Sequence, residues 1–295
     1  MTRGVTRFVR RIPRLAGLLH PAPYGRAVAD LVRLLILRRF LLQDMARRDV
    51  RDQYLGRTFG LFWAAAQPIF LISVYLLAFV YIFQIRLPGN PAALNPSDSL
   101  TLYVISGLIP FFACQNVLTR STTVLSGNAN LVKQVVFPIE VLPIKIIASA
   151  LLTQCICTLM MLGYIVYVFQ KLALIMLLWP CLLCVHYMLL IGCSLFLSVI
   201  SPFFKDMSEL VNMVFIVLIY GTPIFYNVAM LPERLRDLMY FNPVHHLLQC
   251  YRDIFYEVAI TQPASWLIIS LFALASLGVG ARTFTKLKPI LGNVL

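Results

Sequence analysis

The sequence predicts an all-α membrane protein with six transmembrane helices preceded by an amphipathic interfacial helix. Of its 295 residues, 60% are hydrophobic and only 13% are charged, whereas a soluble domain is about a quarter charged. Charge-free apolar windows of about 20 residues or more, the length that crosses a bilayer, occur repeatedly along the chain. They cover residues 59–85, 99–119, 146–170, 172–204, 210–232 and 258–281.

The part of the chain before the first window divides in two. Residues 1–25 are predicted to be a basic cytoplasmic arm that lies on anionic lipid, with an arginine-rich mitochondrial transit peptide as the alternative. In residues 26–58, leucines recur at helical spacing among charged side chains, which is typical of an amphipathic helix in the membrane interface. This helix is expected to break or tilt near Arg38–Arg39. Residues 59–295 then form the six-span domain.

The basic residues predict the orientation of the spans. Twenty of the 25 Lys and Arg residues lie before the first window or in the segments that six spans place on the same side. Because cytoplasmic segments are enriched in basic residues, both termini are predicted to be cytoplasmic. A net charge of +13 can also indicate nucleic-acid binding, but here the charge flanks apolar windows. Membrane topology explains it, and no nucleic-acid partner is expected.

The windows themselves are poor in ionisable groups. His186 is the one side chain in them whose ordinary pKa lies near neutrality. Ion-coupled carriers place acids or bases inside the membrane, so the sequence argues against that class and against chemistry at mid-bilayer. The spacing Cys181-x-x-Cys184-x-His186 superficially resembles a metal site, but it lacks a second ligand cluster. Packing is the preferred interpretation, and no metal is expected.

One enzymatic alternative remains at the cytoplasmic boundary. Asp49 and Asp52 resemble half of the magnesium–pyrophosphate site of a membrane transferase, a site that requires several carboxylates. No second Asp-rich motif follows, so ion pairs with neighbouring arginines are the simpler interpretation. The motif G-x-x-x-x-G-K-[ST] does not occur, so the chain has no P-loop. Any ATP-driven transport therefore requires another polypeptide.

Five segments in register with the six windows carry a family resemblance. They are RDVRDQYLGR at 48–57 with Leu61, Trp63 and Pro68; NLVK at 130–133 with FPIEVLP at 137–143; FKDM at 204–207; TPIFY at 222–226; and NP at 242–243 with YR at 251–252. Together they resemble the permeases of type-2 ABC exporters, above all those for O-antigen, capsule or teichoic acid, over roughly residues 30–290. Lys205–Asp206 departs from the family's more frequent Arg-Asp, and residues 1–25 match nothing in it.

The resemblance implies the permease subunit of an ATP-driven exporter of lipid-linked polysaccharide in the bacterial inner membrane. It implies a homodimer with two cytoplasmic ATPase subunits that bind ATP and Mg²⁺, and a chain that holds no cofactor and performs no chemistry. Two alternatives stay open. One is the same fold exporting a small lipid or drug; the other is a cytoplasm-facing membrane transferase that uses Asp49 and Asp52.

The resemblance also implies two sets of cytoplasmic residues. A short helix between the second and third spans docks into the ATPase, unless the segment is a plain solvated loop; its candidate residues are Asn130, Leu131, Val132, Lys133, Val135, Phe137 and Glu140. Arginines at the entry to the first span, Arg48, Arg51 and Arg57, are candidates to bind the phosphate head of the cargo, because the guanidinium fork recognises phosphate in a bidentate manner. Simple anchoring in lipid is the alternative.

Two further sets lie deeper or on the outer side. Aromatic side chains can stack on sugar rings in a conduit, with helix or lipid packing as the alternative; they are Phe70, Tyr75, Tyr103, Phe111, Phe112, Tyr220 and Phe225. The fifth window is expected to break at Gly221-Thr222-Pro223. The external segment after it has five apolar residues at helical spacing and is expected to form short helices that gate the outer mouth, or else a folded cap. Its candidate residues are Pro223, Tyr226, Asn242, Pro243, Tyr251 and Arg252.

Overall fold

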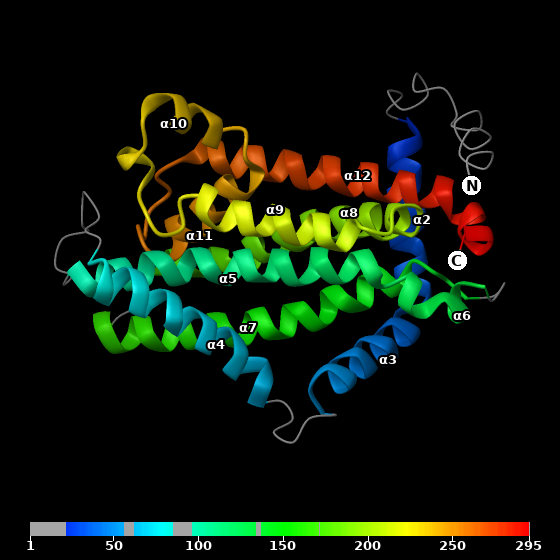
Figure 1. The fold of residues 1–295 in the computed structure, drawn as a ribbon, viewed down its shortest axis with the longest axis horizontal. Coiled ribbons are helices and arrows are strands. Elements are labelled where there is room, and N and C mark those ends of the chain that lie inside the picture. Colours follow the sequence, from blue (N-terminus) through cyan, green and yellow to red (C-terminus); the bar gives the residue numbers. More distant parts are fainter. Residues whose placement is uncertain (1–21, 56–61, 85–95, 134–136, 171, 295) are drawn as a thin grey trace.

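The computed structural model describes residues 22–55, 62–84, 96–133, 137–170 and 172–294. These residues form eleven α-helices with short 3-10 and π segments, and no strand occurs among them. Four helices are long and apolar enough to cross a membrane, and they run side by side along the long axis of the molecule (Figure 1). They are α5 (Pro96–Thr123), α7 (Val141–Phe169), α8 (Trp179–Ile200) and α12 (Pro263–Val294).

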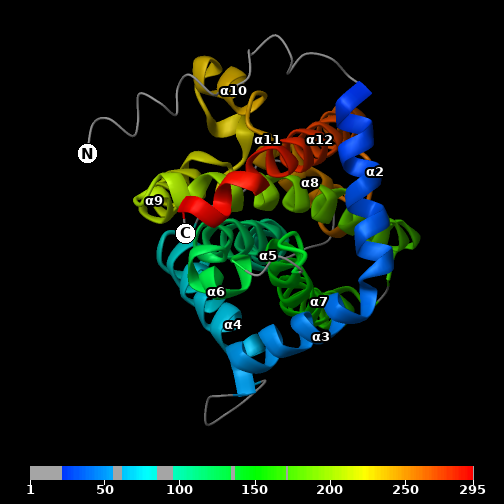
Figure 2. The same ribbon diagram turned by 90° about the vertical axis from the view of Figure 1, so that its right-hand side faces the viewer.

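Helix α5 lies at the centre of the bundle (Figure 2). Its apolar window is 72% buried, compared with 28% to 44% for the other three. Leu102, Phe111 and Val117 are completely enclosed. The surrounding helices keep large apolar side chains on their outer faces, such as Leu159 of α7 and Leu267 of α12. An apolar helix surface that protein does not cover is typical of a segment that faces lipid.

Two shorter apolar helices flank α5. Helix α4 (Phe62–Leu76) continues into the π-helical segment η3 (Leu77–Ile82), and α9 (Met207–Gly221) ends abruptly. The ending has a local cause, because Pro223 lacks an amide hydrogen and restricts the residue before it to extended conformations. Thr222 accordingly has ψ 142°. The predicted break of the fifth span at this point is confirmed.

Helices α2 (Ala22–Leu37) and α3 (Arg39–Val50) cross one end of the bundle (Figures 1 and 2). They are separated at Arg38, so the predicted break near Arg38–Arg39 is confirmed. Helix α2 packs on α12, and α3 packs on α7. In the first contact, the guanidinium of Arg282 lies 4.3 Å from the centre of the Tyr24 ring.

The opposite half of the bundle carries the segment between α9 and α12. It contains α10 (Glu233–Met239) and the strongly amphipathic α11 (Pro243–Phe255). The Asn242 side chain caps α11 by accepting the Val244 N–H at 2.9 Å, and Pro243 occupies the first turn, where its missing donor is harmless. A helix was expected here from the spacing of five apolar residues, and all five are buried: Leu247, Leu248, Tyr251, Ile254 and Phe255.

The structure corrects two predicted windows. The window 210–232 is not one continuous span, because α9 stops at Gly221 and irregular backbone follows. The window 258–281 is displaced, because α12 begins at Pro263 and ends at Val294. Hydropathy misplaced it because the loop before Pro263 contains apolar residues, while the helix continues through Arg282 and two lysines after the apolar stretch has ended.

Helices α8 and α12 make the closest approach in the bundle. A Cβ atom on Gly280 would lie 2.8 Å from the carbonyl carbon and 2.9 Å from the Cα of Gly192, and nearer still to its oxygen. Small residues allow helix backbones in membranes to approach each other this closely. The hydroxyl of Ser276 on α12 also donates to the Leu189 carbonyl of α8, at 3.2 Å.

Candidate functional site

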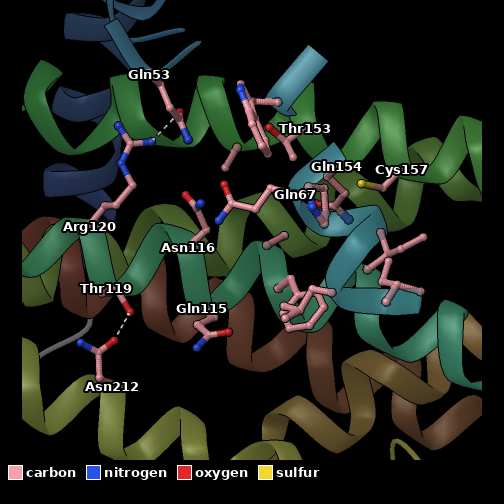
Figure 3. Close-up of a pocket in the computed structure, with 18 residues that line it drawn as sticks. Gln53, Gln67, Gln115, Asn116, Thr119, Arg120, Thr153, Gln154, Cys157 and Asn212 are labelled. Atoms are coloured by element: carbon pink, nitrogen blue, oxygen red, sulfur yellow. Dashed lines mark hydrogen bonds between the residues drawn. The ribbon is translucent and has the colours of Figure 1, made fainter. Parts of the chain in front are cut away.

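A pocket of about 390 Å³ opens among α4, α5 and α7 beside the end of α3 (Figure 3). One wall is the face of α5 from Ile109 to Arg120, which at a rise of 1.5 Å per residue extends about 16 Å along the helix. Helix α4 contributes Trp63 and Pro68, and α7 contributes Thr153. The pocket therefore runs along the spanning direction rather than across it.

Amide side chains dominate the polar lining of this pocket. They come from the π-helical segment η2 (Arg51–Leu55), α4, α5, α7 and α9 (Figure 3), and they are Gln53, Gln67, Gln115, Asn116, Gln154 and Asn212. Each amide offers two donors and an acceptor, and a group of this kind facing hydrocarbon without partners costs several kcal/mol, roughly. Together with the rings of Trp63 and Phe112, they suit a neutral polar ligand or water better than lipid.

A charged cluster closes the end of the pocket next to α3. Arg120 of α5 donates to Asp49 at 2.6 Å and to the Gln53 amide oxygen at 3.2 Å. Ser149 of α7 donates to the same Asp49 oxygen at 2.8 Å, and Lys145 lies 3.8 Å from the other oxygen. Asp49 thus ties α3 to α5 and α7. The expected ion pairing of Asp49 is present, but its partners are distant in sequence rather than neighbouring arginines.

A second polar network lies deep among the helices behind the pocket. Gln154 of α7 accepts from the Tyr187 hydroxyl of α8 at 2.8 Å and donates to the Tyr251 hydroxyl of α11 at 2.7 Å. The same Tyr251 oxygen lies 3.0 Å from Nδ1 of His186, whose Nε2 lies 3.3 Å from the thiol of Cys114 on α5. Because Gln154 also lines the pocket, this network connects the pocket to α11.

Buried Arg252 holds the outer segment against α5. Its guanidinium stacks 3.7 Å from the centre of the Tyr103 ring and donates to the Pro223 carbonyl at the break after α9. The Tyr103 hydroxyl donates to the Tyr226 carbonyl at 3.0 Å.

Glu257 lies outside the spans. Burial is the largest cause that raises the pKa of its carboxyl group, and the negative charge of another acid nearby raises this pKa further.

The sequence model of one family matches residues 41–256, which run from α3 to the end of α11. This chain belongs to the ABC-2 type transporter family. The match takes in the pocket, the Asp49 cluster and the outer segment. The chain is accordingly a multi-pass membrane protein.

Named relatives of this ABC-2 type transporter chain come from several bacteria. It is 26% identical over 258 residues to the O-antigen export system permease protein RfbA of Klebsiella pneumoniae. The aligned region covers 86% of this chain and 95% of that protein. The RfbA protein of Myxococcus xanthus is 24% identical over 229 residues, or 77% and 84% of the two chains. The polysialic acid transport protein KpsM of Escherichia coli is 22% identical over 254 residues, or 84% and 93%.

Two of the three arginines predicted to bind phosphate are not among the residues that line the pocket of this ABC-2 permease. Arg48 and Arg51 are exposed and do not line it, and Arg57 lies outside the described residues. The cation that does line it is Arg120. Arg120 follows the second window in a segment without a recognised motif, so no pattern in the sequence marked it as a candidate.

The predicted ATPase-docking residues divide into outward and inward groups. Asn130 and Lys133 are exposed at the end of the single-turn helix α6 (Ala129–Val132), whereas Val132 is buried against the chain's own core. Leu131 and Phe137 are partly buried against the same core. Glu140 accepts from Lys288 of α12 at 2.7 Å; Val135 lies outside the described residues.

The predicted conduit aromatics also divide. Of the seven, Phe112 lines the pocket. Phe225 is buried and stacks on Phe79 with ring centres 4.0 Å apart, and Tyr75 stacks on Phe225 at 5.1 Å. Buried Phe111 and Tyr103 also pack inside the chain, whereas Phe70 and Tyr220 are exposed.

The amides of the pocket are candidate site residues that the sequence motifs did not reveal. A signal was present, because Gln115, Asn116, Thr119 and Arg120 follow one another at helical spacing inside or beside an apolar window. Polar residues spaced by three or four positions share one helix face. Such a face on a spanning helix indicates a hydrophilic surface.

Proposed function

We propose that this chain is the transmembrane subunit of an ATP-driven exporter that moves a lipid-linked bacterial polysaccharide, O-antigen or capsule, across the inner membrane. The observation that carries the proposal is the amide-lined pocket along α5. Amides exchange hydrogen bonds with sugar hydroxyls without requiring charge, and the indole of Trp63 and ring of Phe112 offer apolar faces to sugar C–H groups. The K. pneumoniae relative, an O-antigen export permease, and the E. coli relative, a polysialic acid transport protein, support the same cargo class.

The proposed topology has six crossings with both termini in the cytoplasm. Besides the four long helices, α4 with η3 comprises residues 62–82, which reach about 31 Å at 1.5 Å per residue and match a hydrocarbon core of about 30 Å. Helix α9 is shorter, so its path is completed by the backbone around Pro223, which Arg252 and Tyr103 partner. Irregular backbone at membrane depth is tolerated where protein satisfies it. In this topology, α2 and α3 lie in the cytoplasmic interface.

A homodimer is proposed because the polar face is incomplete in one copy. Gln67, Asn116 and Asn212 are exposed on apolar helices, and Thr119 donates to Asn212 at 3.1 Å on the same exposed side. Lipid would offer no hydrogen-bond partner to the free donors and acceptors of these amides. A second copy facing this side encloses them around a hydrated path.

The proposed energy source is a pair of separate ATPase subunits that hold ATP and Mg²⁺. They dock at the end of the molecule that carries α6, where Asn130 and Lys133 are exposed. Glu140 and Lys288 bond α7 to α12 beside this surface, so movement imposed there reaches two long helices. The permease itself is proposed to hold no cofactor and to perform no catalysis.

Two alternatives are weaker. Export of a small lipid or drug requires a more apolar pocket than one with six amides. A membrane transferase requires a free carboxylate cluster for Mg²⁺, but Asp49 is already bound by Arg120, Ser149 and Lys145, and within the described ranges no three acids, histidines or cysteines are grouped for a metal.

The test is purification of the tagged chain from its native membrane in mild detergent, followed by ATPase measurements with lipid-linked glycan. We expect a co-purifying ATPase subunit whose hydrolysis the glycan stimulates. Asn116→Leu should reduce this stimulation and leave basal hydrolysis unchanged, whereas Gln43→Leu, an exposed amide on α3 outside the pocket, should change neither. Recovery of the chain alone without nucleotide hydrolysis would contradict the proposed function, and equal effects of the two variants would contradict the role of the pocket.

A further inference from the structure

The amide-lined pocket has one charged end. Of the residues that line it, Arg120 carries a charge and all the others are neutral. It lies at the α3 end, opposite Cys157 (Figure 3). A ligand that fills the pocket therefore meets a cation at one end and neutral amides along the rest of its length.

The guanidinium of Arg120 has unused donor capacity. Its side chain is 29% exposed. It bonds to three acceptors: Asp49, Gln53 and Ser149. A guanidinium has five N–H donors in a planar fork, so three acceptors do not use its full donor capacity. Two oxygens of one anion match this fork better than a single hydroxyl does.

The cluster around Arg120 carries an excess of positive charge. It contains two cations, Arg120 and Lys145, and one acid, Asp49, whose side chain is only 10% exposed. A buried carboxylate left without partners would be strongly destabilising. Here Asp49 keeps Lys145 and the hydroxyl of Ser149 when Arg120 turns toward a ligand. Asp49 is therefore not left as an unpaired buried charge when Arg120 exchanges partners.

We propose that Arg120 is an anion-binding subsite for the phosphate or pyrophosphate group through which the cargo is joined to its lipid. The proposal rests on the proposed function, because it assigns the charged end of the same pocket to the charged part of the cargo. The amides then face the first sugars, and the lipid leaves the pocket on its open side. Arg120 takes the role that the sequence analysis gave to Arg48, Arg51 and Arg57.

A purely structural role for the Arg120–Asp49 pair makes a different prediction. If the pair only anchors α3 to α5 and α7, removing either partner has the same effect. If Arg120 binds an anion in competition with Asp49, the two substitutions have different effects. Arg120→Gln weakens anion binding, whereas Asp49→Asn removes the competitor and leaves binding unchanged or tighter.

The experiment uses the full-length chain in detergent without its ATPase, so that export activity is not involved. Farnesyl pyrophosphate is titrated while the fluorescence of the pocket residue Trp63 is followed, and Trp63→Phe identifies the part of the signal that comes from the pocket. We expect Arg120→Gln to weaken binding at least tenfold, about 1.4 kcal/mol. Arg47→Gln, on the exposed face of α3, should bind like the parent.

Each outcome decides a separate point. Equal weakening by Arg120→Gln and Asp49→Asn, or parental affinity in Arg120→Gln, would overturn the subsite. If Arg120→Gln does not fold, Arg120→Lys replaces it; the charge is kept but the fork is lost, and at least a threefold loss of affinity is expected, with parental affinity overturning the proposal. Parallel titrations with inorganic pyrophosphate and farnesol distinguish a free anion from a lipid headgroup. If binding depends on Arg120 but the chain recruits no ATPase, the proposed exporter function is refuted and the anion-binding subsite is retained.

Discussion

The close approach of α8 and α12 predicts that substitution by alanine has opposite effects on stability at two glycines, one at the crossing and one outside it. Gly280 faces the backbone of Gly192, and a Cβ there would lie 2.8 Å from its carbonyl carbon. Gly163, inside α7, has no heavy atom within 4 Å of the same added atom. Alanine at Gly280 therefore collides with backbone that no rotamer change can remove, whereas alanine at Gly163 meets open space.

The expected magnitudes follow from these distances. Carbon atoms pack at about 3.5 to 4.0 Å, so α8 and α12 must separate by about 1 Å to admit the methyl group of Gly280→Ala. Overpacking of this kind costs about 1–3 kcal/mol. Gly163→Ala has no such term and gains up to about 1 kcal/mol from higher helix propensity.

Thermal unfolding in detergent, followed with a thiol-reactive dye, measures both variants against the parent. A change of 1 kcal/mol shifts the Tm by about 2–4 °C in a chain somewhat smaller than this one. We therefore expect Gly280→Ala to lower the Tm by about 2–12 °C and Gly163→Ala to leave it unchanged or raise it slightly. Equal Tm values for the two variants would refute the close approach of α8 and α12.

Three further predictions concern the buried network, the α6 surface and the outer loop. Tyr251→Phe removes the hydroxyl that accepts from Gln154 and lies beside Nδ1 of His186, and it should destabilise the chain by about 1–3 kcal/mol; an unchanged Tm would argue against the network. Lys133→Glu should reduce co-purification of the ATPase while the Tm stays at the parental value. Val132→Ala should instead lower the Tm. The reverse pattern would place the docking face elsewhere. Because burial raises the pKa of Glu257, its charged form opposes folding, so Glu257→Gln should stabilise the chain near pH 7. This gain should shrink as the pH falls through the raised pKa and vanish below the carboxyl's ordinary value of 4.5, and a gain that persists at pH 4 would contradict the assignment.

Much of the fold followed from the sequence because the causes are local. Four of the apolar windows contain long helices, since their length and composition match the bilayer. The break at Arg38 and the end of α9 before Pro223 were also predicted. Proline acts on its own turn whatever surrounds it, so such positions can be found without knowledge of tertiary contacts.

The site was less predictable, because its residues are brought together from distant segments. Asp49 meets Arg120 and Lys145 across 71 and 96 positions of the chain, and Tyr251 meets Gln154 across 97. Nothing near Asp49 in the sequence indicates which cation it pairs with, and the abundant arginines of α3 suggested the wrong partners. The sequence indicated that Asp49 would be paired, and only the packing of α3 on α7 decided the partner.

The sequence by itself determined the class of protein, the membrane segments and the points at which helices break. The tertiary structure alone decided which face of each helix is enclosed, which aromatic side chains pack inside the chain and which polar side chains share a pocket. The physical reason is that lipid and protein core are both apolar. A helix in a bilayer can therefore be hydrophobic on every side, and its amphipathicity no longer distinguishes the buried face from the face that meets lipid.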